Sequence, residues 1–392
     1  MCYVDRPPRE RLLVFGAPDI QEAEIAEVVD SMRSRWLGTG PKALEFERTF
    51  AAYKQASHSV AVSSCTAALH LSLIAAGVQP GDEVITSPLT FCATANAILH
   101  AGARPVLADI DADSMNICPH AIDAAISEKT KAILPVHFAG RPCDMESIMA
   151  LAQAHDLLVI EDCAHAIETE VQGRPAGTLG DMGCFSFYAT KNVTTAEGGM
   201  ILCRREADAQ KLKRQSLHGL SHDAWRRFHD LGYKHYFVTE LGFKYNMTDL
   251  QAAIGLHQLA RVESNWNRRR EIWNRYLEQL ADTPLQLPAP VRKGDRHAYH
   301  LFTCLVQAER AGLSRDEFLV RMHRENIGLG VHYLSLPEHP YYQEQLGWRA
   351  AQWPVAERIG QQTVSLPLSP ALSDDDVADV IAAVHRVLEE SA

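Results

Sequence analysis

From His58 to Cys203 the chain alternates short apolar runs, typical of strands, with stretches of helical periodicity. The expected strands are Ser59–Val62, Glu83–Thr86, Pro105–Asp109, Ala132–Val136, Leu157–Ile160, Gly183–Phe187 and Gly199–Cys203. The expected helices between the earlier strands are Thr66–Ala76, Thr94–His100, Pro119–Ile126 and Met145–Ala154. This alternation predicts an α/β fold with a mostly parallel, buried sheet, whose ligands gather at the carboxyl ends of the strands.

The segments on either side of this region have other patterns. Two helices are expected before it, and a long polar loop or arm after it, at His218–Lys244. The remaining expected elements are helices at Ile20–Arg35, Ala43–Tyr53, Thr248–Glu278, Ser314–Glu325 and Ser373–Glu390, and strands at His300–Val306 and Gly328–His332. We expect an entry segment and large domain at residues 1–257, and a small domain at residues 258–392.

Charge and cysteine usage narrow the classes of protein. The formal net charge of −11 disfavours a broad surface for nucleic acid or an anionic membrane. No apolar run approaches the roughly 18 residues of a spanning helix, and the first residues lack the apolar core of a signal peptide. The nine cysteines are scattered without a C-x-x-C pair, so we expect reduced thiols, no metal site and a cytoplasmic protein.

Lys191 and Asp162 point most directly to a chemistry. Asp162 ends an apolar run, and Lys191 stands between another such run and two glycines, so each lies just past an expected strand. A lysine amine can form a Schiff base with a carbonyl cofactor. A carboxylate can keep a pyridine nitrogen protonated, and pyridoxal 5′-phosphate (PLP) needs both partners. The sequence therefore predicts a PLP site with Lys191 and Asp162 as its catalytic residues.

Other residues of this region are candidates for holding the cofactor. The turn before Thr66 and Ala67 is rich in serine and opens a helix, where backbone N–H groups favour a phosphate. The same residues also suit a simple helix cap. Phe91 can stack on a flat heterocycle or pack in the core. His165 can fix the cofactor ring. For Asp162 the alternative to a cofactor contact is that its side chain caps the turn after its strand.

With these motifs in order, the sequence resembles the DegT/DnrJ/EryC1/StrS family of PLP-dependent sugar aminotransferases. The resemblance runs through nearly the whole chain. Its blocks include Trp36-Leu-Gly-Thr-Gly-Pro41, Glu161-Asp-Cys-Ala-His165, Phe185-Ser-Phe187, Glu197-Gly-Gly199 and Lys244-Tyr-Asn246. Within the family the sequence is most similar to enzymes that aminate C4 of a UDP-4-keto-pentose for lipid A modification. The residues that carry this likeness are His165, the motif His218–Trp225 and Lys244-Tyr-Asn246. The motif Pro337–Tyr342 also occurs in relatives that aminate UDP-4-keto-6-deoxy-N-acetylhexosamines.

The resemblance implies a fold-type I transferase with a seven-stranded sheet, a smaller C-terminal α/β domain and a homodimer with shared active sites. It implies that Thr66, Ala67 and Ser186 hold the cofactor phosphate. Asn246 should reach the phosphate bound by the neighbouring subunit.

The implied reaction is transamination of a keto-sugar nucleotide with L-glutamate as the amino donor. Lys191 then has two roles, as cofactor anchor and as proton carrier. The implied substrate contacts are Thr39, Gly40, His332 and Tyr333, with His218 as a weaker candidate. For His332, a ring bonded locally at a strand end is an equal alternative.

Three alternatives accompany this prediction. A sugar dehydratase of the same superfamily carries histidine in place of the Schiff-base lysine, and this chain has Lys191. A cyclitol or 3-keto-sugar aminotransferase shares the motifs and stays open. A non-catalytic regulator needs a lost catalytic residue, whereas Asp162 and Lys191 are both present.

Overall fold

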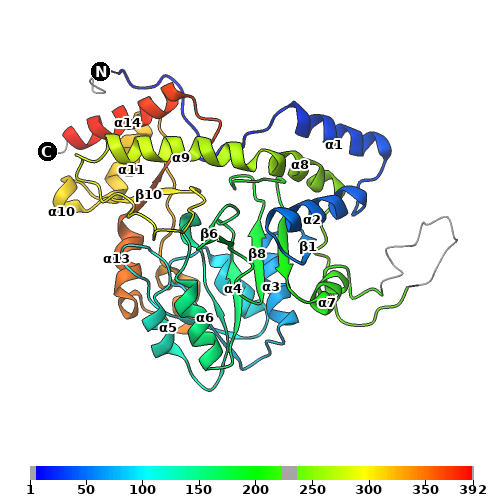
Figure 1. Ribbon diagram of the computed structural model, residues 1–392. Coiled ribbons are helices and arrows are strands. Elements are labelled where there is room, and N and C mark those ends of the chain that lie inside the picture. Colours follow the sequence, from blue (N-terminus) through cyan, green and yellow to red (C-terminus); the bar gives the residue numbers. More distant parts are fainter. Residues whose placement is uncertain (1–5, 222–235, 391–392) are drawn as a thin grey trace.

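The computed structural model describes residues 6–221 and 236–390 (Figure 1). The centre is a seven-stranded sheet in the order β1-β9-β8-β5-β4-β2-β3. Its strands are β1 (His58–Val62), β2 (Glu83–Thr86), β3 (Arg104–Leu107), β4 (Thr130–Leu134), β5 (Leu158–Asp162), β8 (Met182–Ser186) and β9 (Gly199–Cys203). Only β9 runs against its neighbours, because β8, β5, β4, β2 and β3 pair in parallel and β9 pairs antiparallel with β1 and β8. The seven strands expected between His58 and Cys203 all exist, each within two residues of its expected bounds.

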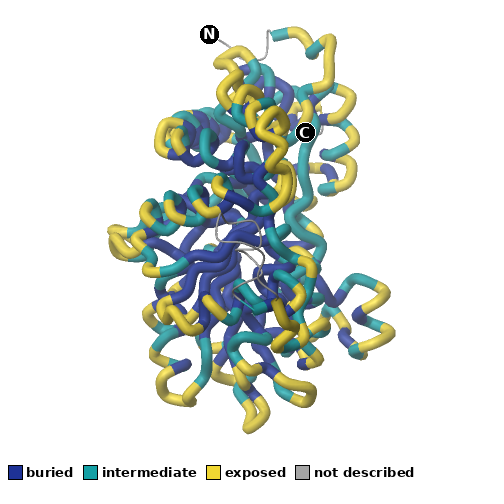
Figure 2. The backbone as a smooth tube through the Cα atoms, turned by 90° about the vertical axis from the view of Figure 1, so that its right-hand side faces the viewer, coloured by how far each residue is buried: buried dark blue, intermediate teal, exposed yellow. Residues whose placement is uncertain are grey.

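Helices cover both faces of this sheet, which is why its strands are mostly apolar. On one face, β-strand residues pack with α3 (Cys65–Ala75), α4 (Cys92–His100) and α7 (Glu206–Ser216). On the other face lie α2 (Pro41–Tyr53), α5 (Pro119–Ala125), α6 (Met145–Ala154) and α8 (Asp249–Ala260). Figure 2 shows the strands as the most continuously buried part of the molecule. Helix α1 (Glu22–Ser34) packs along α8.

The small C-terminal domain has a separate apolar core. That core is formed by α9 (Val262–Gln279), α11 (Arg315–Arg324), α14 (Asp374–Glu389) and the antiparallel pair β10 (Phe302–Leu305) and β11 (Thr363–Leu366). Smaller elements complete the chain: β6 (Glu170–Val171), β7 (Arg174–Pro175), α10 (Ala308–Ala311), α12 (Pro340–Leu346), α13 (Pro354–Gln362), and the 3-10 turns η2 (Phe138–Gly140), η4 (Leu336–Glu338) and η5 (Ala350–Gln352). The domain division at residue 257, which stays a proposal, falls inside α8.

Two expected elements differ from the structure. The helix expected at Thr248–Glu278 is broken at Arg261, whose φ and ψ are −102° and 3° and whose side chain is held by Glu24 at 2.5 Å. The strand expected at Gly328–His332 is wrong. Gly328 bonds to Leu13 and Gly330 bonds to Ser365, so successive backbone groups have different partners and no ladder extends.

The arm after α7 is described only at its base. Leu217 bridges Lys244 and Leu220 bridges Val238, so the two sides of the arm run antiparallel. Residues 222–225, which end the motif beginning at His218, lie outside the described residues. Within the described part of the chain, no helix is long and apolar enough to span a membrane.

Candidate active site

Asp162 is fixed at the carboxyl end of β5 by two backbone hydrogen bonds to the segment that follows β4. Its N–H donates to Pro135 O at 2.9 Å and its carbonyl accepts from His137 N at 3.1 Å. Its carboxylate is buried and accepts hydrogen bonds from Thr94 Oγ1 at 2.9 Å and Ala164 N at 3.1 Å. Burial raises the pKa of Asp162, although these hydrogen bonds act to lower it. Thr94, on α4, was not predicted from the sequence.

Lys191 lies in the connection between β8 and β9. This connection is folded back on itself, because Phe187 N bonds to Gly198 O and Thr195 N bonds to Phe187 O, both at 2.9 Å. β8 is parallel to β5, so Lys191 and Asp162 share the same edge of the sheet, as predicted. Burial lowers the pKa of the Lys191 amine to about 8. Among the described residues, none forms a hydrogen bond or ion pair with this amine, which leaves it free to react.

The N-terminus of α3 is where the phosphate cradle is expected. Ser64 caps the helix and accepts from Ala67 N at 3.1 Å, which leaves the N–H groups of Cys65 and Thr66 in the first turn. The strand β9 passes close by, since a Cβ on Gly199 would stand 2.5 Å from the carbonyl carbon of Ser64. Ser186, at the end of β8, is buried, and its Oγ accepts from Tyr188 N at 3.4 Å.

His165 and Tyr333 are joined by a hydrogen bond. His165 Nε2 lies 3.0 Å from the Tyr333 hydroxyl, and His165 Nδ1 accepts from Ala139 N at 3.2 Å. Burial, and after it the charge of Lys191, lower the pKa of His165 well below its usual range, so the ring is neutral and its proton is on Nε2. Phe91 is 57% exposed and its ring centroid is 5.9 Å from that of Tyr333. An exposed ring at this edge is available for stacking.

His332 is held locally. Its Nδ1 lies 2.9 Å from Ser365 Oγ, its ring packs 5.5 Å from that of Phe15, and burial lowers its pKa to about 3. The alternative of a locally bonded histidine therefore fits the structure, although no strand ends there. Lys191 also lowers this pKa, which places His332 near the same amine.

Two of the other substrate candidates, Thr39 and Gly40, form a second group with the cofactor candidate Asn246. Asn246 bridges Val62 at the end of β1, and its amide donates to Thr39 Oγ1 at 2.6 Å. Gly40 N donates to Asp249 Oδ1 at 2.7 Å, which ties the same loop to α8. His218 lies at the base of the arm, where its N–H donates to Phe243 O at 2.8 Å. No hydrogen bond among the described residues links its ring to the group around Lys191.

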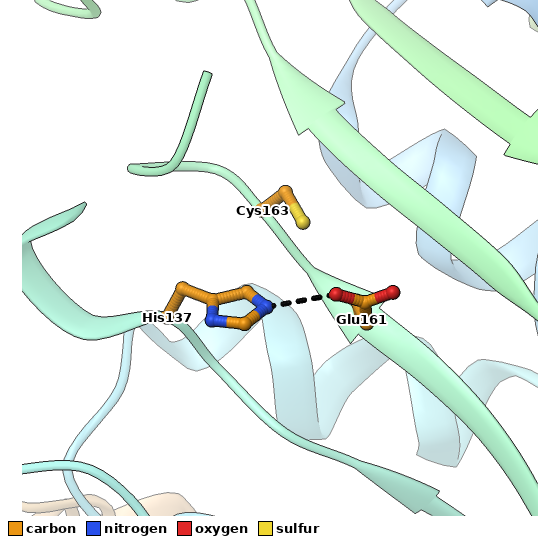
Figure 3. Close-up of side chains that lie close together, drawn as sticks. All are labelled: His137, Glu161 and Cys163. Atoms are coloured by element: carbon orange, nitrogen blue, oxygen red, sulfur yellow. Dashed lines mark hydrogen bonds and ion pairs between the residues drawn. The ribbon is translucent and has the colours of Figure 1, made fainter. Parts of the chain in front are cut away.

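A cluster behind the site contains His137, Glu161 and Cys163 at metal-ligand spacing (Figure 3). Each oxygen of Glu161 is already engaged. Its carboxylate lies 3.0 Å from His137 Nε2 and accepts N–H groups from Gly177, Leu179 and Gly180 at 2.7–2.8 Å. His137 Nδ1 accepts from Cys143 N at 3.1 Å. These bonds make the cluster a scaffold that ties β5 to the 177–180 loop.

A cavity of about 800 Å³ lies elsewhere, between α5, α6 and the segment around residue 292. It is lined by polar groups such as Asp111, Arg141 and Asp295. None of the candidate residues above lines it. The reactive groups therefore converge at the sheet edge and not in this cavity.

The described residues fit PLP. An unpaired amine, a buried carboxylate and a helix N-terminus meet at one sheet edge, and an exposed aromatic ring stands beside them. These are the groups needed to bind a carbonyl, a pyridine nitrogen, a phosphate and a ring face.

Comparisons with known proteins agree with this arrangement. Residues 18–385 match the model of the DegT/DnrJ/EryC1/StrS aminotransferase family. Spore coat polysaccharide biosynthesis protein SpsC of Bacillus subtilis is 48% identical over 382 residues, which cover 97% of this chain and 98% of SpsC.

Solved structures extend the likeness to the fold. The putative sugar aminotransferase Spr1654 from Streptococcus pneumoniae, in its PLP form, has a TM-score of 0.89 at 34% identity, covering 97% of this chain and 100% of that one. Helicobacter pylori PseC, an aminotransferase involved in the biosynthesis of pseudoaminic acid, has a TM-score of 0.89 at 28% identity, with 97% and 100% covered. The fold class and the cofactor predicted from the sequence are confirmed.

Proposed function

Because this chain belongs to the DegT/DnrJ/EryC1/StrS aminotransferase family, and is thus a PLP-dependent enzyme, we propose that it aminates a nucleotide-linked keto sugar. The preferred substrate is a UDP-linked 4-keto sugar and the amino donor is L-glutamate. The observation that carries the proposal is the unpaired Lys191 amine at the same sheet edge as the buried Asp162 carboxylate.

Several residues have definite tasks in this proposal. When bound, PLP supplies an electron sink for the cleavage of a bond at the donor carbon. Asp162 would hold the proton of the pyridine nitrogen. Thr66 and Ser186 would hold the phosphate together with the N–H group of Cys65, whereas the N–H of Ala67, also expected there, donates to Ser64 Oγ. Lys191 would anchor the cofactor and then carry the proton between donor and cofactor. A pKa of about 8 suits this work, because the amine can both accept and release a proton near neutral pH.

The choice of sugar rests on sequence likeness. His165, His218 and the Lys244-Tyr-Asn246 run favour a UDP-4-keto-pentose. SpsC is named for polysaccharide biosynthesis and PseC for pseudoaminic acid, and both names favour a sugar destined for a glycan. We propose that the enzyme works as a homodimer, with Asn246 reaching the partner's cofactor phosphate. Cytoplasmic location is part of the same proposal.

A substrate panel tests these points. Purified holoenzyme is incubated with L-glutamate and a set of UDP- and dTDP-linked 4-keto sugars, 3-keto sugars and cyclitol ketones, and products are identified by mass. The expected product is the amine of a UDP-4-keto sugar, together with 2-oxoglutarate. Lys191→Ala is the matched control and should give neither. Turnover of only 3-keto sugars or cyclitols would overturn the substrate proposal, and turnover with only another donor would overturn glutamate.

A further inference from the structure

His300, which the sequence analysis assigned only to the start of a strand, lies beside the cofactor site. Its backbone N–H donates to Ala139 O at 3.3 Å, while the N–H of the same Ala139 donates to His165 at 3.2 Å. The side chain of His300 is buried, and its ring centroid is 4.6 Å from that of His165. The backbone of one residue, Ala139, thus bonds to both histidines at the site.

The side chain of His300 contacts the residue that follows Lys191. His300 Nδ1 lies 2.9 Å from Asn192 Oδ1. The amide nitrogen of Asn192 donates to Glu168 Oε2 at 2.8 Å and to Ala298 O at 3.1 Å. A carboxylate and a carbonyl only accept, so these two bonds fix which end of the amide faces His300.

The orientation of Asn192 also fixes the proton on His300. An amide oxygen only accepts, so His300 Nδ1 must be the donor. Burial, and after it the charge of Lys191, lower the pKa of His300 well below its usual range. The ring is therefore a neutral imidazole whose Nδ1–H is directed at the neighbour of the reactive lysine.

We propose that His300 is a positioning residue for cofactor capture. Its Nδ1–H donates to Asn192, and this hydrogen bond holds in place the backbone that carries Lys191. The Asn192 side chain is held from three sides, by His300, Glu168 and Ala298. Of these three partners, His300 also contacts His165, the residue assigned to the cofactor ring. The proposal rests on PLP binding through Lys191 and is independent of the sugar and of the donor.

Two variants of His300 separate its hydrogen bond from its bulk. His300→Phe keeps a ring against His165 but loses the donor. His300→Asn loses the ring but can place an N–H near the position of Nδ1. Each apoprotein is titrated with PLP, and the dissociation constant and the visible absorbance of the bound cofactor are measured. We expect His300→Phe to weaken PLP binding about five- to tenfold, as for one lost hydrogen bond, and to shift the absorbance. His300→Asn should stay within about threefold of the wild type.

His297→Phe is the matched control. His297 is equally buried in the same segment, but it packs 4.8 Å from Trp273 of α9, and its Nδ1 accepts from Tyr299 N at 2.7 Å. The His297→Phe protein should therefore bind PLP with the affinity of the wild type. A His300→Phe protein indistinguishable from this control would overturn the proposal, and so would equal losses in His300→Phe and His300→Asn.

A variant of Asn192 tests the same hydrogen bond from its other side, in case His300→Phe does not fold. Asn192→Ala removes the acceptor together with the bonds to Glu168 and Ala298, so it should weaken PLP binding at least as much as His300→Phe does. In the Asn192→Ala background, His300→Phe should cause no further loss, because the hydrogen bond that it would remove is already absent. If His300→Phe does not fold, unchanged PLP affinity in Asn192→Ala is sufficient to overturn the proposal.

Discussion

At the scale of single residues, burial shifts the ionisable groups of the site toward their neutral forms. Burial lowers the pKa values of Lys191, His165 and His300, and it raises that of Asp162. The neutral histidines add no positive charge beside the lysine, so the low pKa of its amine comes from burial. A neutral amine is the form that attacks a carbonyl.

The pKa of Lys191 gives a prediction for cofactor capture. With a pKa of about 8, about one tenth of the amine is unprotonated at pH 7. The rate at which apoprotein captures PLP should therefore rise about tenfold per pH unit below 8 and level off above it. Stopped-flow absorbance of apoprotein mixed with PLP between pH 6 and 10 measures this. A rate still rising steeply between pH 9 and 10 would instead indicate an ordinary, solvated lysine.

At the scale of elements, β9 and α3 depend on each other. β9 is antiparallel within a parallel sheet, so its first residue, Gly199, arrives where β1 leads into α3. A Cβ at Gly199 would stand 2.5 Å from the backbone of Ser64 and 2.8 Å from Cys65 N. Backbone at that distance cannot yield without moving the phosphate cradle.

Gly199→Ala should therefore lower both stability and PLP affinity. We expect a loss of about 1–3 kcal/mol in the free energy of unfolding, as for overpacking in a core, with PLP binding weakened at least tenfold. Urea unfolding of apoprotein and a PLP titration measure the two effects. Gly38→Ala is the stability control, since a Cβ there meets nothing within 4 Å. A normal PLP affinity in Gly199→Ala would show that the cradle is set by other contacts.

The elements also show what a sequence can reveal. Apolar runs gave the seven strands, and strand ends placed Asp162 and Lys191 at one edge, because local periodicity and parallel topology suffice for both. The partners of these residues could not be found in this way. Thr94 bonds to Asp162 across 68 positions and His300 bonds to Asn192 across 108, and no local pattern marks such pairs. The wrong strand at Gly328–His332 has the same cause, since its two partners lie far apart in the chain.

At the scale of the whole molecule, α9 connects the small domain to the active site. Figure 1 shows this helix running from α8 toward α14. Its outer part packs in the core of the small domain through Trp273 and Tyr276. Its inner part carries Arg269, which reaches Glu168 at 2.5 Å, and Glu168 in turn holds Asn192 beside Lys191. An ion pair thus joins the small domain to Glu168 and through it to Asn192, the neighbour of the proposed cofactor anchor Lys191.

This buried pair gives the last prediction. Arg269 and Glu168 are 1% and 0% exposed, so Arg269→Met leaves a carboxylate in the core with Asn192 as its remaining side-chain donor. Removing one partner of such a pair costs about 3–5 kcal/mol. Thermal and urea unfolding should show this loss, and PLP affinity should fall with it, because the carboxylate no longer holds Asn192 in place.

The double variant Glu168→Gln/Arg269→Met separates charge from contact. It removes both charges and keeps an amide oxygen that can accept from Asn192, so it should recover part of the lost stability and of the PLP affinity. Arg48→Met is the comparison at the surface, where the pair with Glu45 is solvated and the midpoint of unfolding should not move. If Arg269→Met unfolds like Arg48→Met, the pair does not join the domains. If it loses stability but binds PLP normally, Glu168 stabilises the fold without positioning Asn192, and the connection from α9 to Lys191 is absent.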